Sequence, residues 1–168
     1  VYDLFGYGAL TAEVVEYLMA LLLKKEKEDK IDLVVLFERL QEFYLCWCDG
    51  EFIDATEDTL PQKKARQLQQ EKIGQRQVDV YAGLNAMILL FELHRCARSR
   101  EELREKIWFR PCGKAEDEDF DEMRLLRIIG YSQCLGVGAF VGIVGKFLSG
   151  ADLSDVGLSD ADLSGAEI

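Results

Sequence analysis

The sequence predicts a mainly α-helical protein, in which a multi-helix domain over residues 1–145 is followed by a short repetitive segment over residues 146–168. Three observations lead to this fold class. Apolar residues recur at the spacing of a buried helix face, residues that cap helices stand in front of these stretches, and the end of the chain repeats every five residues. A period of five suits neither an α-helix nor a flat β-strand, and a short fixed period is typical of a solenoid.

Two helices are predicted near the N-terminus. Thr11 can cap a Leu-rich helix over residues 12–28, and Asp32 can cap a second helix that ends near Cys48, with Gly50 just beyond its end. The second helix should have one broad buried face, because its large side chains follow the i, i+3, i+4 spacing. These side chains are Leu33, Leu36, Phe37, Leu40, Phe43, Tyr44 and Trp47.

The middle of the chain is predicted to hold a loop and two helices. Residues 51–60 form a polar loop, and Pro61 suits the first turn of a polar, basic helix that runs to about Ile73. Residues 75–97 are predicted to form the most buried helix, because their apolar residues leave little polar surface.

Two shorter helices are predicted to follow. Ser99 and Glu102 have the spacing of a capping box, which would open a helix that ends near Trp108. A last helix is predicted over residues 120–130, and the Gly-rich apolar residues 131–148 lead from it into the repeats. The whole domain is then expected to contain about six helices.

The repeat emerges when residues 146–168 are divided into groups of five. Leu or Ile always falls at one position of the group, and a small apolar residue falls two positions earlier. Because the large apolar residue never slips from this register, a disordered low-complexity tail is disfavoured. The predicted inward-facing residues are Leu148, Leu153, Leu158, Leu163, Ile168, Ala151, Val156, Ala161 and Ala166.

This pattern resembles the pentapeptide-repeat family, whose unit is roughly Ala-(Asp/Asn)-Leu-x-x. The resemblance implies a right-handed, four-sided β-helix, in which each group of five residues forms one side. Residues 146–168 amount to about one coil, whereas solenoids need about three stacked units. We therefore expect the truncated start of a β-helix, in a fragment of a longer protein.

The helical region also resembles the region between a NACHT-like NTPase and the pentapeptide repeats of large cyanobacterial proteins. This resemblance implies an upstream NTPase or sensor domain. The sequence lacks the phosphate-binding pattern Gly-x-x-x-x-Gly-Lys-Ser/Thr, so any nucleotide chemistry would belong to that upstream part. The similar stretches are residues 47–55, 60–64, 74–85 and 127–132.

Charge and cysteine content narrow the choice of partner and compartment. A net charge of -11 argues against nucleic acid or an anionic membrane as partner. The five cysteines are expected to be free thiols in the reducing cytoplasm. Residues 128–145 carry no charge over a length that could span a membrane, but their glycines favour a buried helix pair.

The candidate metal and nucleotide motifs are weak. Cys46 and Cys48 lie two residues apart on one predicted helix and so point in different directions, as do His94 and Cys96. The Gly-rich residues 136–142 only faintly resemble a dinucleotide-binding loop, because the repeats begin too soon after them. We therefore expect no metal and no cofactor.

Two glycines in this stretch have a different predicted role. Gly138 and Gly142 lie four residues apart, and we expect them to allow close packing of a short helix that covers the first coil of the repeats.

The predicted function is a non-catalytic structural and protein-interaction module. It would be a helical cap and linker that joins an upstream NTPase or sensor domain to a pentapeptide-repeat rod, with an acidic face for a protein partner. Weak end-to-end self-association through the last coil is also expected. Two alternatives stay open: an enzyme with a site near His94, Cys96 and Cys112, and an acidic repeat protein that mimics DNA.

Overall fold

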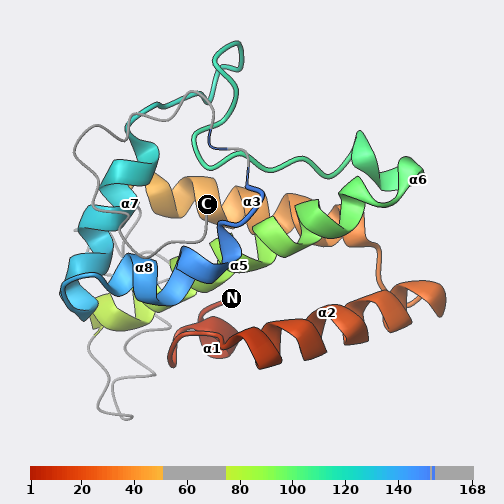
Figure 1. The fold of residues 1–168 in the computed structure, drawn as a ribbon, viewed down its shortest axis with the longest axis horizontal. Coiled ribbons are helices and arrows are strands. Elements are labelled where there is room, and N and C mark those ends of the chain that lie inside the picture. Colours follow the sequence, from red (N-terminus) through yellow and green to blue (C-terminus); the bar gives the residue numbers. More distant parts are fainter. Residues whose placement is uncertain (51–74, 152, 154–168) are drawn as a thin grey trace.

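The computed structural model describes residues 1–50, 75–151 and 153 (Figure 1). These residues form α-helices, 3₁₀-helices and loops, and no strand occurs among them. The elements in chain order are α1 (Tyr2–Phe5), α2 (Ala12–Lys27), α3 (Leu33–Cys48), α5 (Gln75–Arg98), α6 (Glu101–Arg104), α7 (Arg124–Ser132), η2 (Gln133–Leu135), α8 (Ala139–Val144) and η3 (Gly145–Phe147).

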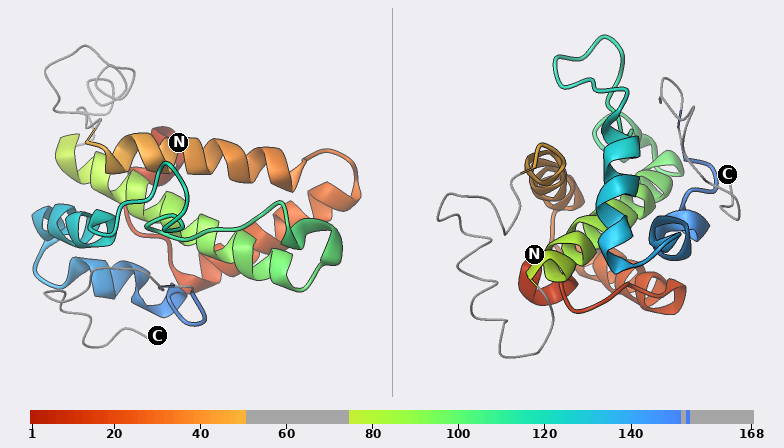
Figure 2. Two further views of the ribbon diagram at one scale, coloured as in Figure 1. Left: turned by 90° about the horizontal axis from the view of Figure 1, so that it is seen from above. Right: turned by 90° about the vertical axis from the view of Figure 1, so that its left-hand side faces the viewer.

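Helix α5 is the centre of the fold, as its apolar composition predicted. Both views of Figure 2 show it running between α3 on one side and α7 and α8 on the other. It also packs against α1, α2 and α6. Its buried residues lie on all sides of the helix and include Val78, Val80, Leu84, Met87, Ile88, Leu89, Leu90, Phe91 and Leu93.

Helices α2 and α3 begin where their capping residues predicted. The Thr11 side chain accepts a hydrogen bond from the backbone N–H of Val14, at 3.4 Å. Asp32 Oδ1 accepts from the N–H groups of Val34 and Val35, at 2.8 and 3.3 Å. These bonds satisfy donors that the first turn of a helix otherwise leaves open. Helix α3 then buries Leu33, Phe37, Leu40, Tyr44 and Trp47.

The predicted fold class is wrong in its second part, which expected the helices to give way to a β-helix at residue 146. The chain is still helical there, because Lys146 lies within η3. Phe147 and Leu148 are buried in the same core as the helices. Joining this large core removes their apolar surface from water, which a stack of about one coil cannot do as fully.

Several predicted segments lie outside the described residues. They are the loop over residues 51–60, the helix over residues 61–73, and the later repeat positions Val156, Leu158, Ala161, Leu163, Ala166 and Ile168.

The predicted capping box is also wrong, and the helix after it is shorter than predicted. Ser99 Oγ donates to the carbonyl of Cys96, at 2.7 Å, instead of capping a new helix. Glu102 pairs with the side chain of Arg100, at 3.0 Å. Helix α6 is therefore only about one turn long. The helix predicted from residue 120 begins later, at Arg124.

The uncharged stretch forms two helical segments that meet at a sharp bend. Arg124–Leu135 and Ala139–Phe147 are inclined by 97°, and α7 packs against α8. Among the described residues, no single helix has the length and apolar character needed to cross a membrane. Gly138 makes the bend, with a φ of 75° at the start of α8. Among the described residues, a Cβ at Gly142 would meet no atom within 4 Å, and most of the first coil that this helix was expected to cover lies outside them.

Asn85, a fully buried residue of α5, holds the N-terminal segment. Its Nδ2 donates to the carbonyls of Phe5 and Gly8, at 2.8 and 2.7 Å. Its Oδ1 accepts from the N–H of Leu10, at 2.9 Å. A buried amide needs such partners, because leaving it without hydrogen bonds costs about 1–3 kcal/mol.

Asp79, also fully buried on α5, connects α1, α3 and α5. Its carboxylate accepts from Tyr2 Oη at 3.0 Å and from Trp47 Nε1 at 3.2 Å. The Trp47 ring lies directly against α5 at Gly83, where a Cβ would stand 2.1 Å from the ring atom Cε2. Only glycine leaves room for this contact.

The Gly83→Ala substitution should lower the free energy of unfolding by about 1–3 kcal/mol, because the added methyl group has no space beside Trp47. The matched control is Gly130→Ala on α7, where a Cβ would meet no atom of the described residues within 4 Å. The control should be neutral or stabilise by up to about 1 kcal/mol, because Ala is the better helix former. Urea denaturation of both variants measures the difference, and equal stabilities would contradict the Trp47 contact.

Candidate functional site

Two arginines at the end of α5 hold the segment through which the chain leaves the helical core. Arg95 Nη2 donates to the carbonyls of Phe147 and Ser149, at 3.1 and 2.9 Å. Arg98 Nη1 donates to the carbonyl of Gly150, at 3.3 Å. A guanidinium group suits this task because its donors are fixed in one plane and it stays charged at every physiological pH.

Local sequence positions these arginines and their acceptors. Arg95 pairs with Glu92, three residues earlier on the same face of α5. Gly150 adopts a φ of 70°, a left-handed conformation that favours glycine, so the chain turns at this point. The Ala151 N–H donates to the Leu148 carbonyl at 2.8 Å and closes the turn.

Three of the predicted inward-facing repeat residues lie at this junction. Leu148 is completely buried, and Ala151 and Leu153 are partly buried against the same helical core. The first repeat residues therefore pack on helices, and the inward position of the later ones stays a prediction. We call the two arginines and residues 147–151 and 153 the anchor.

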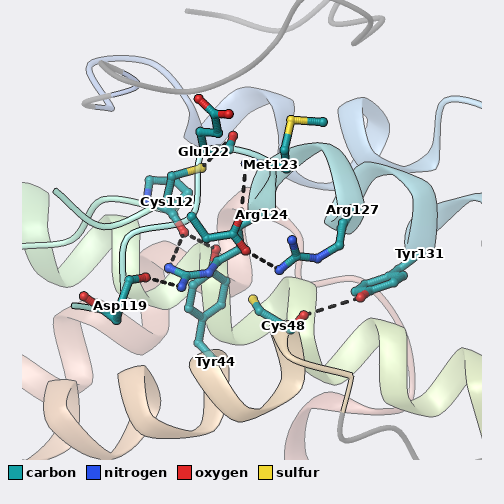
Figure 3. Close-up of polar contacts among 11 residues, drawn as sticks. Tyr44, Cys48, Cys112, Asp119, Glu122, Met123, Arg124, Arg127 and Tyr131 are labelled. Atoms are coloured by element: carbon teal, nitrogen blue, oxygen red, sulfur yellow. Dashed lines mark hydrogen bonds and ion pairs between the residues drawn. The ribbon is translucent and has the colours of Figure 1, made fainter. Parts of the chain in front are cut away.

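A second polar cluster connects α3, α7 and the loop between α6 and α7 (Figure 3). Arg124 is buried, and its guanidinium donates to the carbonyls of Pro111, at 3.3 Å, and Asp119. Tyr44 Oη donates to the same Pro111 carbonyl, at 2.9 Å. The two side chains thus fix the loop on α3.

Further contacts join the same loop to α7. Asp121 pairs with Arg127, and this guanidinium holds the pKa of the Asp121 carboxyl below its usual range. The Asp121 N–H donates to the Cys112 carbonyl at 2.9 Å, and Cys112 Sγ donates to the Glu122 carbonyl at 3.7 Å. Tyr131 Oη, at the other end of α7, donates to a carbonyl of α3.

Burial holds the tyrosine hydroxyl and the cysteine thiols of this cluster in their protonated forms. Burial raises the pKa of the Tyr44 hydroxyl well above its ordinary value and that of the Cys48 thiol to about 12. Burial also raises the pKa of Cys112. Because the thiolate is the nucleophilic form of cysteine, Cys48 and Cys112 are poor nucleophiles at neutral pH. The hydrogen bonds and the ion pair of this cluster hold the loop between α6 and α7 against the helices.

A small cavity of about 190 Å³ lies beside this cluster. Its lining carries both signs of charge, with Arg110, Lys114 and Arg124 facing Asp117 and Asp119. Such a mixed lining does not select a ligand of either charge.

The three residues of the predicted enzyme site have different neighbours. His94 is buried with its ring centroid 4.9 Å from that of Trp108. Cys96 is partly exposed, and the charges of Arg100 and Glu26 act on it. Cys112 belongs to the Arg124 cluster.

The predicted directions of the cysteine pair on α3 are confirmed, because Cys46 is exposed and Cys48 is buried. Within residues 1–50, 75–151 and 153, the His, Cys, Asp and Glu side chains form no group of three that could hold a metal ion.

Comparisons with protein-family models, with curated proteins and with solved structures give no match to this chain.

The free energy of unfolding should fall as the pH rises from about 9 to 12. In this range the unfolded state loses the Cys48 thiol proton, whereas the folded state keeps it because burial raises the pKa of this thiol. Below pH 9 both states hold this proton, so its contribution is constant. The expected slope for one proton is about 1.4 kcal/mol per pH unit.

Cys48→Ala should remove this part of the slope. Leu40→Ala, another buried change on α3, should lower stability at every pH but keep the slope. Urea denaturation between pH 8 and 11 measures both, and a Cys48→Ala slope equal to that of the original chain would contradict the burial of this thiol.

Proposed function

We propose that this chain is a non-catalytic protein-interaction module, in which the helical domain anchors the first residues of the repeat segment. The observation that carries this proposal is the anchor, where Arg95 and Arg98 donate to three carbonyls of residues 147–150. The burial of Leu148 supports it, because a buried leucine side chain stabilises its position by about 1.5–3 kcal/mol relative to an exposed one.

The anchored segment would orient an acidic surface for a protein partner. Residues 151–168 contain acidic residues and no Lys or Arg. A partner with a basic surface fits this charge, and electrostatic attraction over about 8 Å at physiological salt would speed the encounter. By contrast, the same charge repels nucleic acid and anionic lipid.

The other end of the module would connect to an upstream NTPase or sensor domain. The similarity of the helical region to the region after a NACHT-like NTPase in cyanobacterial proteins supports this connection. A cytoplasmic location agrees with the five cysteines, none of which forms a disulfide bond in the structure.

The Arg95→Ala substitution should release the anchor while the helical core stays folded, because Arg95 is partly exposed and, besides Glu92 on its own helix, it bonds to the exit segment. A hydrogen bond from a charged group contributes about 1.5–3 kcal/mol, so amide exchange in residues 148–153 should accelerate about tenfold or more. Hydrogen exchange measured by mass spectrometry gives this rate.

The matched control is Arg39→Ala, which removes an exposed arginine of α3. Exchange in residues 148–153 should not change in the control. If Arg95→Ala and Arg39→Ala gave the same exchange in this segment, the helical domain would not act as its anchor.

A further inference from the structure

Helix α2 carries two apolar faces, of which only one is buried. Val15 and Met19 are buried against the core. Val14, Tyr17 and Leu21 are 48%, 71% and 39% exposed. Each residue advances about 100° around a helix, so Tyr17 and Met19, two residues apart, point to opposite sides. In Figure 1, α2 lies at the lower edge of the molecule.

The exposed face forms a continuous stripe along the helix. Val14, Tyr17 and Leu21 follow the i, i+3, i+7 spacing, which aligns side chains on one side. A surface helix of a globular protein normally presents polar residues on this side. Exposed apolar residues that are contiguous mark an interaction surface, whereas single ones are ordinary.

Charged residues flank this stripe in a pattern with two-fold symmetry. Glu13 and Glu16 lie in the first half of α2, and Lys24 and Lys27 lie in the second half. Glu13 and Lys24 are separated by about three full turns and therefore project in nearly the same direction, and the same holds for Glu16 and Lys27. Because Glu16 follows Glu13 by three residues, the two pairs are neighbours, and all four side chains lie on one flank of the stripe. All four are exposed.

We propose that the exposed face of α2 pairs with the same face of a second copy of this chain, in an antiparallel, two-fold symmetric dimer. A two-fold axis that passes between the two helices, perpendicular to both, reverses the helix direction and sets the same flank of each helix side by side. Glu16 of one copy then faces Lys24 of the other, and Glu13 faces Lys27. A parallel pairing would set opposite flanks together and leave these charges without their complements.

The apolar residues fit the same register. With the axis level with Ala20, Leu21 of each copy falls between Tyr17 and Leu21 of the other, as knobs fall into holes between antiparallel helices. Ala20 is exposed and projects from the charged flank, where its small side chain leaves room for the long charged ones. One helix face is smaller than a standard interface of about 1,600 Å², so we expect a dissociation constant on the order of 100 μM.

Sedimentation equilibrium of the complete 168-residue chain tests the dimer. The original chain should shift from monomer to dimer as its concentration rises from about 10 to 500 μM. Tyr17→Glu should abolish the dimer without unfolding, because this side chain is 71% exposed. The matched control is Val35→Glu, which changes a 41% exposed apolar residue of α3 and should keep the dimer. Circular dichroism confirms that each variant is folded.

Charge reversal tests the antiparallel register. Glu16→Lys alone places like charges together at two symmetric positions, and Lys24→Glu alone does the same. Each should weaken the dimer roughly fivefold, because an exposed ion pair contributes up to about 1 kcal/mol. The double variant restores both pairs and should return the dissociation constant to within about twofold of the original.

A chain that stays monomeric at 500 μM would overturn the proposal. So would an association that survives Tyr17→Glu, which is the result expected if copies meet through their C-terminal repeats. If the double variant dimerised as weakly as the single variants, the antiparallel register would be overturned.

Discussion

A fully buried carboxylate must find hydrogen-bond donors, and the structure depends on how Asp79 finds them. A buried carboxyl group without hydrogen-bond partners would be costly, and the hydrogen bonds from Tyr2 and Trp47 offset part of this cost for Asp79. Both donors come from other helices, and together they fix the rotation of α5 about its own axis. That rotation turns Gly83 toward the Trp47 ring. It also sets the direction of Arg95 and Arg98 at the far end of the same helix, where the chain leaves the core.

The sequence predicted those parts of the fold that depend on local patterns. Thr11 and Asp32 cap the first long helices because their side chains reach N–H groups only two or three residues away. The predictions failed where distant partners compete with a local pattern. Ser99 bonds to the preceding helix rather than opening a new one. Leu148 fits the five-residue repeat but is buried against the helical core, so a change of period did not predict a change of structure.

The sequence did not predict the anchor, for a related reason. Arg95 and Arg98 can be seen in the sequence as cations in the last turns of a buried helix, where they interact favourably with the helix dipole. Their acceptors are backbone carbonyls about fifty residues later, and any residue type supplies a carbonyl. Arg124 is similar, because it bonds to the carbonyls of Pro111 and Asp119. Patterns of side-chain types cannot reveal such contacts.

The net charge of the chain limits where two copies can associate, and the apolar stripe of α2 lies in a suitable place. Two copies of a chain with a net charge of -11 repel each other, so a self-association surface should be locally neutral. Helix α2 meets this condition, because its acids Glu13, Glu16 and Glu26 balance its bases Lys24, Lys25 and Lys27. Salt should then have opposing effects. It screens the repulsion between whole chains over about 10 Å at 0.1 M, but it also weakens the ion pairs across the interface. Association through α2 should therefore depend little on salt, whereas contact between the acidic repeats should strengthen as salt rises.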